Sequence, residues 1–147
     1  MHVVIRTKAF DPYTEISQYQ EGMGKKGKYG AIASFIGTMR DFNDGEEVTG
    51  MTLEYYPGMT ESHITEICEQ AAKQWHILDC LVIHRVGDIR INDAIVLISI
   101  WAAHRGDALD ACRFIIEDLK AKAPFWKKEK RPGGDHWVEK NTSGYSE

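Results

Sequence analysis

The sequence predicts a single α+β domain, and three observations support this fold class. Two segments, 60–75 and 106–123, repeat apolar residues at the helical spacing i, i+3, i+4, i+7. Other segments are rich in the β-branched and aromatic residues that are typical of strands. Helices and strands are mixed without the strict strand–helix–strand alternation of a doubly wound sheet. Since the 147 residues contain no internal repeat and no linker, we expect one domain over 1–147.

The N-terminal part is predicted to contain a strand over 2–7 and then a helix. Asp11 before Pro12 is typical of a helix start, because the aspartate caps free N–H groups and proline fits the first helical position. The next segment, 21–30, contains four glycines and three lysines, and we predict a mobile loop there. Two further strands are expected over 30–37 and 48–56, on either side of a turn-rich segment over 41–47.

The first long amphipathic helix is predicted to begin at Thr60, whose hydroxyl can cap it, and to run to about Trp75. One stripe of this helix is expected to face a core. The stripe consists of Ile64, Ile67, Cys68, Ala71 and Trp75. Strands over 81–86 and 94–103 follow and are joined through 87–93.

The second long helix is predicted to begin near Gly106 and Asp107, with the acid at the positive end of the helix dipole. Pro124 ends it, because proline cannot continue a helix. The expected inner stripe is Leu109, Cys112, Ile116, Leu119 and Ala123. A C-terminal β-hairpin is predicted from strands over 125–130 and 136–139 around a turn at 131–135, followed by a flexible tail over 140–147.

Charge is distributed unevenly along the chain. The 18 basic and 22 acidic residues give a net charge of −4, which disfavours a nucleic-acid binder driven by bulk positive charge. The segment 120–131, however, holds six basic residues and one acid, so it carries +5 and leaves −9 for the rest of the chain. A cationic segment in an acidic protein therefore marks a candidate site.

Cysteine content and hydropathy favour a cytoplasmic protein with reduced, buried thiols. Cys68, Cys80 and Cys112 form neither a CxxC motif nor a disulfide framework. The longest apolar run, 94–103, is shorter than the ~20 residues needed to cross a bilayer, and the N-terminus lacks a signal-peptide hydrophobic region. The sequence has no Walker, HExxH or GxSxG motif and no GxGxxG motif after a strand, and the histidines lack ligand spacing, so neither a metal nor a cofactor is expected.

Two lysines of the cationic segment are candidates for chemistry. Lys120 falls one position past the apolar stripe of the second helix, and Lys127 follows Phe125 and Trp126 just after the helix-ending Pro124. Partial burial and a second ammonium nearby both lower the pKa of a lysine, which suits acid/base or nucleophilic work near neutral pH. The alternative is that these lysines neutralise the end of the helix and solvate the hairpin.

Further cations lie at predicted strand ends, where free N–H groups and helix dipoles can bind anions. They are Arg40, His104 and Arg105. Each alone is compatible with an ordinary surface or capping residue. Together they favour a phosphorylated or carboxylated ligand, because arginine can hold such groups in a bidentate manner.

Five motifs occur in order along the chain. They are Phe-Ile-Gly-Thr-Met-Arg at 35–40, Leu-Glu-Tyr-Tyr-Pro-Gly-Met at 53–59, Ile-His-Arg-Val-Gly at 83–87, Ala-His-Arg at 103–105 and Leu-Lys-Ala-Lys-Ala-Pro-Phe-Trp-Lys-Lys-Glu at 119–129. With these motifs the sequence closely resembles the large, catalytic subunit of molybdopterin synthase, the MoaE family. The likeness covers about 30–139, and the first thirty residues match only loosely.

The resemblance implies an α/β hammerhead fold with an antiparallel-rich mixed sheet, and a homodimer at the centre of a heterotetramer. In this family a small ubiquitin-like subunit inserts its C-terminal Gly-Gly tail, carrying a thiocarboxylate, into each active site. Sulfur passes to cyclic pyranopterin monophosphate, and two transfers build the dithiolene of molybdopterin. No metal or cofactor is implied, because sulfur transfer precedes metal insertion in molybdenum cofactor biosynthesis.

The resemblance also implies site residues. The family's catalytic lysines match Lys120 and Lys127. Its substrate-binding positions fall on Thr38, Met39, Arg40, His104, Arg105, Lys120, Lys127, Lys128 and Glu129, and Phe35 matches an aromatic residue that lines the pocket. In the family the His-Arg pair reaches across from the second protomer. Thr38 replaces a basic residue of some relatives, so no charge is implied there.

Two other classes of function remain open. The first is a non-catalytic binding module in which the basic hairpin, with Phe125, Trp126 and Trp137, docks an acidic protein or single-stranded RNA. RNA binding would weaken steeply with salt, which distinguishes it from an enzyme. The second is an inactive paralogue that serves as a scaffold, against which the retained Lys120 and Lys127 argue.

Overall fold

The computed structural model describes residues 1–139 and 144–146, and in them the predicted α+β fold is confirmed. The helices are α1 (Pro12–Met23), α2 (Met59–Gln74) and α3 (Arg105–Lys122). The strands are β1 (His2–Arg6), β2 (Ala31–Thr38), β3 (Phe42–Asn43), β4 (Glu46–Glu47), β5 (Gly50–Tyr55), β6 (Ile77–Arg85), β7 (Gly87–Arg90), β8 (Ala94–Ala102), β9 (Phe125–Arg131) and β10 (Gly134–Val138). The predicted tail over 140–147 lies outside the described residues except for 144–146.

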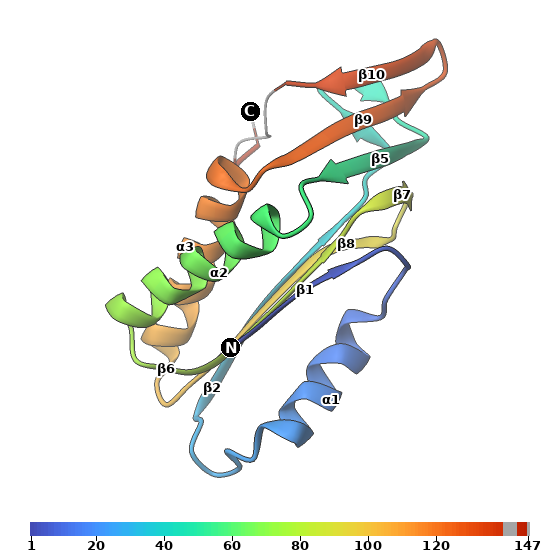
Figure 1. Ribbon diagram of the computed structural model, residues 1–147. Helices are drawn as coiled ribbons and strands as arrows, with labels where there is room; N and C mark the ends of the chain where they lie inside the picture. Colours follow the sequence, from blue (N-terminus) through green and yellow to red (C-terminus); the bar gives the residue numbers. More distant parts are fainter. Residues whose placement is uncertain (140–143, 147) are drawn as a thin grey trace.

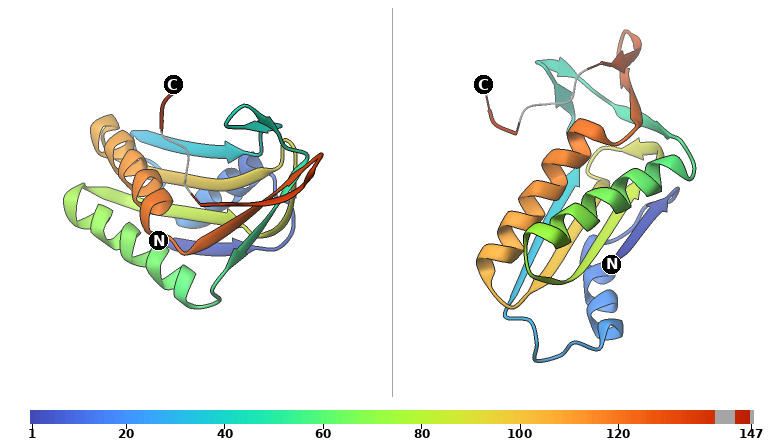
Figure 2. Two further views of the ribbon diagram at one scale, coloured as in Figure 1. Left: turned by 90° about the horizontal axis from the view of Figure 1, so that it is seen from above. Right: turned by 60° about the vertical axis from the view of Figure 1, so that its left-hand side comes forward.

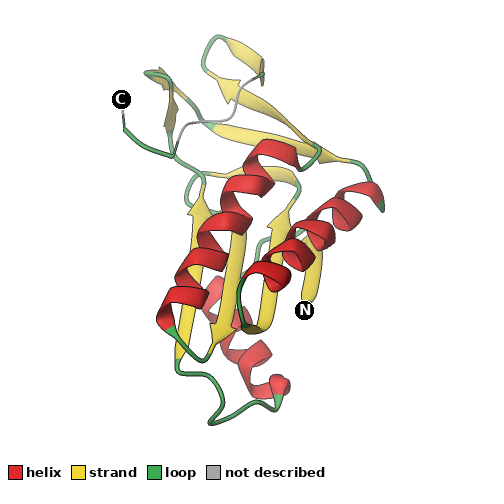
Figure 3. Ribbon diagram, turned by 90° about the vertical axis from the view of Figure 1, so that its left-hand side faces the viewer, coloured by secondary structure: helices red, strands yellow, loops and turns green. Residues whose placement is uncertain are grey.

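The main sheet has the strand order β1-β6-β8-β2, in which β1 and β6 are parallel and the other neighbours antiparallel. Helices α2 and α3 lie side by side on one face, and α1 covers the opposite face (Figure 1; Figure 3). The central strands β6 and β8 are therefore covered on both faces. This explains why β8 is almost continuously apolar, and why β6 contains the apolar run 80–83, instead of alternating.

A hydrophobic core fills each side of the main sheet. On the side of α2 and α3, the buried residues include Ile64 and Ile67 of α2 and Ile115 of α3. On the other side, Trp101 of β8 packs against Tyr19 of α1, with ring centroids 5.4 Å apart. The helix start at Asp11 and Pro12 is confirmed, since the Asp11 side chain accepts a hydrogen bond from the backbone N–H of Tyr13.

A second, antiparallel sheet with the order β10-β9-β5-β7 lies across one end of the main sheet (Figure 2). Its inner residues Met51, Leu53 and Ile89 form a separate buried cluster. The hairpin of β9 and β10 confirms the C-terminal hairpin predicted from the sequence. Because β9 begins just after α3, this arrangement places the basic segment where the helix end meets the second sheet.

Two expectations about the helices are wrong. Gly58, not Thr60, caps α2, and Thr60 is buried inside the first turn, where its hydroxyl donates to the carbonyl oxygen of Pro124 at 3.2 Å. In α3, Leu109 is 59% exposed, and Ala108 takes its place in the buried stripe. Helix α3 packs against β8 and β2, and Ala108, which is fully buried, lies on the inward side of its first turns.

Three segments expected to be loops contain regular structure. Helix α1 continues to Met23, so the loop predicted over 21–30 begins only at Gly24, whose left-handed backbone (φ 70°) ends the helix. The connection 87–93 contains β7. The turn-rich segment 41–47 is a small hairpin of β3 and β4 whose central residues Asp44 and Gly45 both have positive φ, as a tight two-residue turn requires.

The cysteines agree with the expectation of reduced, buried thiols. Cys68, Cys80 and Cys112 are free and buried, with the sulfur atoms of Cys68 and Cys80 3.7 Å apart. None of the helices in the described part of the chain is both long and apolar enough to cross a membrane.

Trp101→Ala is expected to lower the free energy of unfolding by about 3–5 kcal/mol, because it empties a fully buried site. It also removes the hydrogen bond of 3.0 Å from the indole Nε1 to Gln20. Urea denaturation measures the change. Trp137→Ala, at an exposed position, is the matched control and should cost less than about 1 kcal/mol. Equal losses in the two variants would contradict the assigned core.

Candidate active site

A pocket with a volume of about 160 Å³ lies where the C-terminal end of α3 meets the second sheet and the segment after β2. Its cationic side chains are Arg40, Lys120 and Lys127. Its other polar side chains are Thr38, Asn43, His84 and Glu129. Apolar residues, among them Met39, Leu119 and Phe125, complete the wall.

Chain geometry explains why both lysines reach this pocket. Lys120 lies in the last turn of α3, which ends before Pro124. Lys127 is the third residue of β9, and side chains alternate between the two faces of a strand. Lys127 and Glu129 therefore face the pocket, while Trp126 and Lys128 face the other way.

Burial lowers the pKa of both lysines, and a neighbouring cation lowers each further: Lys127 acts on Lys120, and Arg40 acts on Lys127. The pKa of Lys120 falls to about 8, first because of burial and then because of Lys127. Burial is also the main cause that lowers the pKa of Lys127, while its hydrogen bond to Lys120 and the charge of Glu129 act in the opposite direction. The hydrogen bond thus favours the neutral amine on Lys120 and the ammonium on Lys127, so the pair offers a nucleophile or base beside a fixed positive charge.

If the neutral amine of Lys120 is the reactive form, turnover rises about tenfold per pH unit below the pKa of about 8 and levels off above it. The rate at saturating substrate between pH 6 and 9.5 measures this. A rate that is constant from pH 6 to 8 would contradict the role of the neutral amine.

Arg40 reaches the pocket from the segment that follows β2. Its guanidinium lies over the ring of Phe42, 4.7 Å from the ring centroid. The backbone of Met39 is held by hydrogen bonds with Asp93 and Asn92, which anchor this segment to the turn before β8. Arg40 is therefore placed on the same side of the pocket as the small β3–β4 hairpin.

Glu129 is only 5% exposed, and both of its oxygens are engaged. Oε2 accepts a hydrogen bond of 2.7 Å from Asn43 Nδ2, and Oε1 accepts one of 2.9 Å from Arg131. Sequence reasoning missed Asn43, because the segment 41–47 reads as a plain turn. Only the pairing of β9 with β5 and the position of the small hairpin bring Asn43 and Glu129 together.

Sequence reasoning also assigned no role to His84, which lies near the end of β6 and is 3% exposed. Its ring stacks on Phe125 with centroids 4.0 Å apart. Burial, with Lys120 and Lys127 nearby, lowers the pKa of His84 to about 3. The histidine is therefore neutral at any pH at which the lysine pair could function.

Two residues expected in the pocket lie outside it. Phe35 is on β2 and does not line the pocket. Lys128 Nζ lies over the ring of Trp137, 5.3 Å from the ring centroid, and 4.0 Å from Asp135. Both are on outer faces of the protomer.

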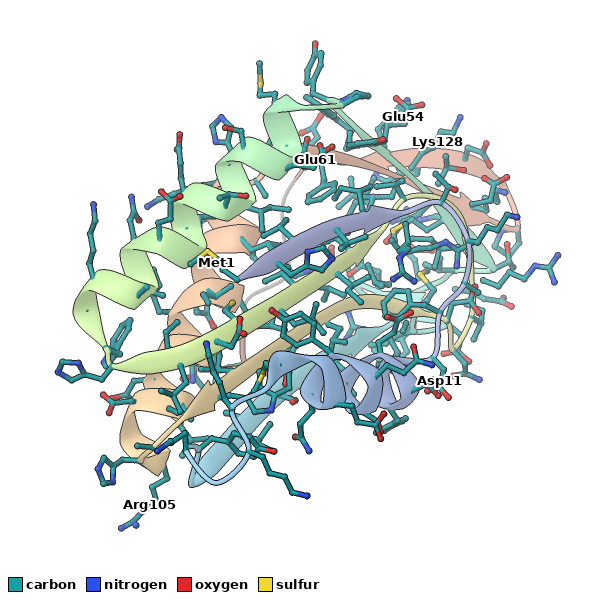
Figure 4. The ribbon with its side chains drawn as sticks, turned by 60° about the horizontal axis from the view of Figure 1, so that its bottom comes forward. Met1, Asp11, Glu54, Glu61, Arg105 and Lys128 are labelled. Atoms are coloured by element: carbon teal, nitrogen blue, oxygen red, sulfur yellow. The ribbon has the colours of Figure 1, made fainter. Side chains whose placement is uncertain are left out.

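His104 and Arg105 lie far from the lysine pair. They stand at the N-terminal end of α3, and Lys120 is near its C-terminal end. Fifteen residues of helix at 1.5 Å each separate Arg105 from Lys120 by roughly 22 Å. Figure 4 shows Arg105 and Lys128 at opposite ends of the molecule. Within one protomer the His-Arg pair therefore cannot contribute to this pocket.

Within the described residues, no group of three or more histidine, cysteine, aspartate or glutamate side chains is placed to hold a metal ion. The pocket instead combines three cations with one engaged carboxylate. Such a site attracts an anionic ligand.

Comparisons with known proteins agree on one family. The model of the MoaE protein family matches residues 5–122. The chain is 49% identical over 130 residues to a molybdopterin synthase catalytic subunit of Ralstonia nicotianae, covering 88% of this chain and 72% of the relative. It is 42% identical over 140 residues to the Pseudomonas aeruginosa protein of the same name, covering 95% and 91% of the two chains.

Solved structures show the same relationship. The MoaE protein of Burkholderia ambifaria superposes with a TM-score of 0.79 at 40% identity, covering 97% of this chain and 92% of the other. Molybdopterin synthase from Staphylococcus aureus gives a TM-score of 0.81 at 29% identity, covering 91% and 94%.

Proposed function

Because the chain belongs to the MoaE protein family, we propose that it is the catalytic subunit of a molybdopterin synthase. In this role it is a sulfurtransferase of molybdenum cofactor biosynthesis. The sulfur donor is the C-terminal thiocarboxylate of a small ubiquitin-like subunit, and the acceptor is cyclic pyranopterin monophosphate. The free, buried thiols support a location in the reducing cytoplasm.

The observation that carries this proposal is the half-buried Lys120–Lys127 pair with Arg40 in one pocket. A cyclic phosphate and a thiocarboxylate are both anions, so the cationic pocket concentrates them. An extended Gly-Gly tail fits a narrow entrance because glycine has no side chain.

The two lysines have different roles in the proposed reaction. Lys120, with its lowered pKa, acts as general acid/base or attaches transiently to a reaction partner. Lys127 stabilises the negative charge that develops as sulfur adds and the cyclic phosphate opens. Arg40 holds the phosphate or pterin. Thr38, Met39 and Glu129 line the same pocket and complete the substrate-binding set.

His104 and Arg105 enter this scheme through a second copy of the chain. Since they lie about 22 Å along α3 from Lys120, each pocket receives them from the partner in a homodimer. Phe35 and Lys128, which face away from the pocket of their own protomer, are proposed to contribute to substrate binding in the assembled heterotetramer.

Reconstituted turnover tests the proposal. The chain is mixed with cyclic pyranopterin monophosphate and with a small subunit ending in a thiocarboxylate, or with the same subunit ending in an ordinary carboxylate. Molybdopterin is expected only with the thiocarboxylate. No product in either mixture would contradict the proposal.

The alternative of a basic-aromatic binding module has less support. The basic side chains of the segment 120–131 do not all point the same way. Lys120, from α3, and Lys127, from β9, face the pocket. Lys128, the next residue of β9, lies over Trp137 on the opposite face. The segment therefore does not present one continuous cationic and aromatic surface to RNA.

A further inference from the structure

The side chain of His84 is held in one tautomer by its backbone neighbour. Nδ1 lies 2.9 Å from the carbonyl oxygen of Arg85. A carbonyl oxygen only accepts hydrogen bonds, so Nδ1 must carry the proton. The other ring nitrogen, Nε2, is then unprotonated and presents a lone pair.

The ring is also fixed in orientation. It stacks on Phe125 at an interplanar angle of 19°, and Phe125 is itself fixed where β9 leaves the end of α3. The hydrogen bond that the structure gives for this ring joins Nδ1 to the carbonyl oxygen of Arg85. Nε2 is not among the buried side-chain atoms that lack a partner in the described part of the chain, which are Asn43 Oδ1 and Arg85 Nε. His84 lines the pocket, and the pocket therefore gives access to this atom.

His84 Nε2 adds an acceptor to a pocket whose charged side chains are mostly donors. Arginine and protonated lysine side chains only donate hydrogen bonds, and the amine of Lys120 is already engaged with Lys127. The two oxygens of Glu129 already accept from Asn43 and Arg131, and Asn43 Oδ1 is closed off. The low pKa of His84, caused mainly by burial, keeps Nε2 unprotonated near neutral pH.

The proposed substrate needs such an acceptor. Its phosphate offers acceptors to the cations, whereas its reduced pterin rings and amino group carry N–H donors. A pocket without a free acceptor would leave these N–H groups unpaired on entry, at a cost of about 1–3 kcal/mol for each one buried.

We propose that His84 is a substrate-binding residue whose Nε2 accepts a hydrogen bond from an N–H group of the pterin. This inference rests on the proposed function and deepens it. His84 would select a ligand with a donor-bearing ring, while Arg40, Lys120 and Lys127 would select its negative charge.

Two substitutions distinguish the hydrogen bond of Nδ1 from that of Nε2. His84→Asn keeps an amide donor close to the position of Nδ1 and removes the acceptor at Nε2. His84→Gln places its amide group close to the position of Nε2, where its oxygen can accept. Both variants are combined with a small subunit ending in an ordinary carboxylate, so that the pterin binds without turnover. Equilibrium binding of cyclic pyranopterin monophosphate, and of inorganic phosphate as a ligand without N–H groups, is then measured.

His84→Asn is expected to weaken pterin binding about tenfold, equivalent to about 1.4 kcal/mol, and His84→Gln by less than about threefold. Phosphate binding should be unchanged in both. Unchanged pterin binding in His84→Asn would overturn the proposal, and so would equal losses in the two variants or a parallel loss of phosphate binding. If the unsubstituted complex neither binds nor converts the pterin, the proposed function itself fails.

A measurement on the unsubstituted protein covers the case in which a variant does not fold. With ¹⁵N-labelled histidine, the Nε2 resonance of His84 should move upfield when the pterin binds, because an unprotonated imidazole nitrogen shifts in this direction on accepting a hydrogen bond. Inorganic phosphate should leave it in place. An unmoved resonance at saturating pterin would overturn the proposal.

Discussion

Lys120→Ala is expected to lower molybdopterin formation on the order of 10³-fold, while the complex with the small subunit still forms. The substitution removes the amine whose pKa lies near 8 and leaves the ammonium of Lys127 in place. Since Lys120 lies inside the pocket, its loss changes little of the protomer's outer surface. Turnover is measured in the reconstituted assay, and complex formation by size-exclusion chromatography.

Lys122→Ala provides the matched control for this variant. Lys122 is a lysine on the same turn of α3, but it is exposed and pairs with Asp118 at 3.0 Å. Its replacement should leave turnover within about twofold, because an exposed pair of this kind contributes little. Near-normal turnover in Lys120→Ala, or an equal loss in Lys122→Ala, would show that the pocket lysine is not required.

Mixing two inactive variants should restore activity if each active site takes residues from both protomers. Arg105→Ala and Lys120→Ala are each expected to be inactive as homodimers. In a mixed dimer one site carries both substitutions and the other carries neither. Random mixing makes half of the dimers mixed, so about a quarter of all sites are intact and about a quarter of the activity should return.

The control mixture combines Lys120→Ala with Lys127→Ala. These two lysines line one pocket of one protomer, so every site in a mixed dimer lacks one of them. No activity should return. An Arg105→Ala homodimer with normal turnover, or the same recovery in both mixtures, would contradict a pocket shared between protomers.

Local sequence signals predicted most of the fold. The apolar spacing in 60–75 and 106–123 and the proline at 124 gave both long helices and the end of α3 within a few residues. The errors concern choices that only packing decides. Thr60 is a good capping residue, but its hydroxyl bonds to Pro124 from a distant segment, and Gly58 caps the helix instead. Leu109 fits the apolar stripe, yet Ala108 is the residue that is buried.

The lysine pair could be predicted because its members are close in sequence and separated by a helix-ending proline. His84 and Asn43 could not, because they enter the pocket through distant strand pairing and a small hairpin. The charge of the segment 120–131 located the site but did not show which side chains face it. Alternation along β9 settles that question by directing Lys127 inward and Lys128 outward.

The central claim is that this chain catalyses sulfur transfer from a protein thiocarboxylate to a pterin. The most direct test uses a small subunit whose thiocarboxylate carries ³⁴S, with mass spectrometry of the pterin product. The proposed function predicts a product that contains two labelled sulfur atoms, and labelling that depends on Lys120. A pterin that remains unlabelled while the thiocarboxylate stays intact would contradict it.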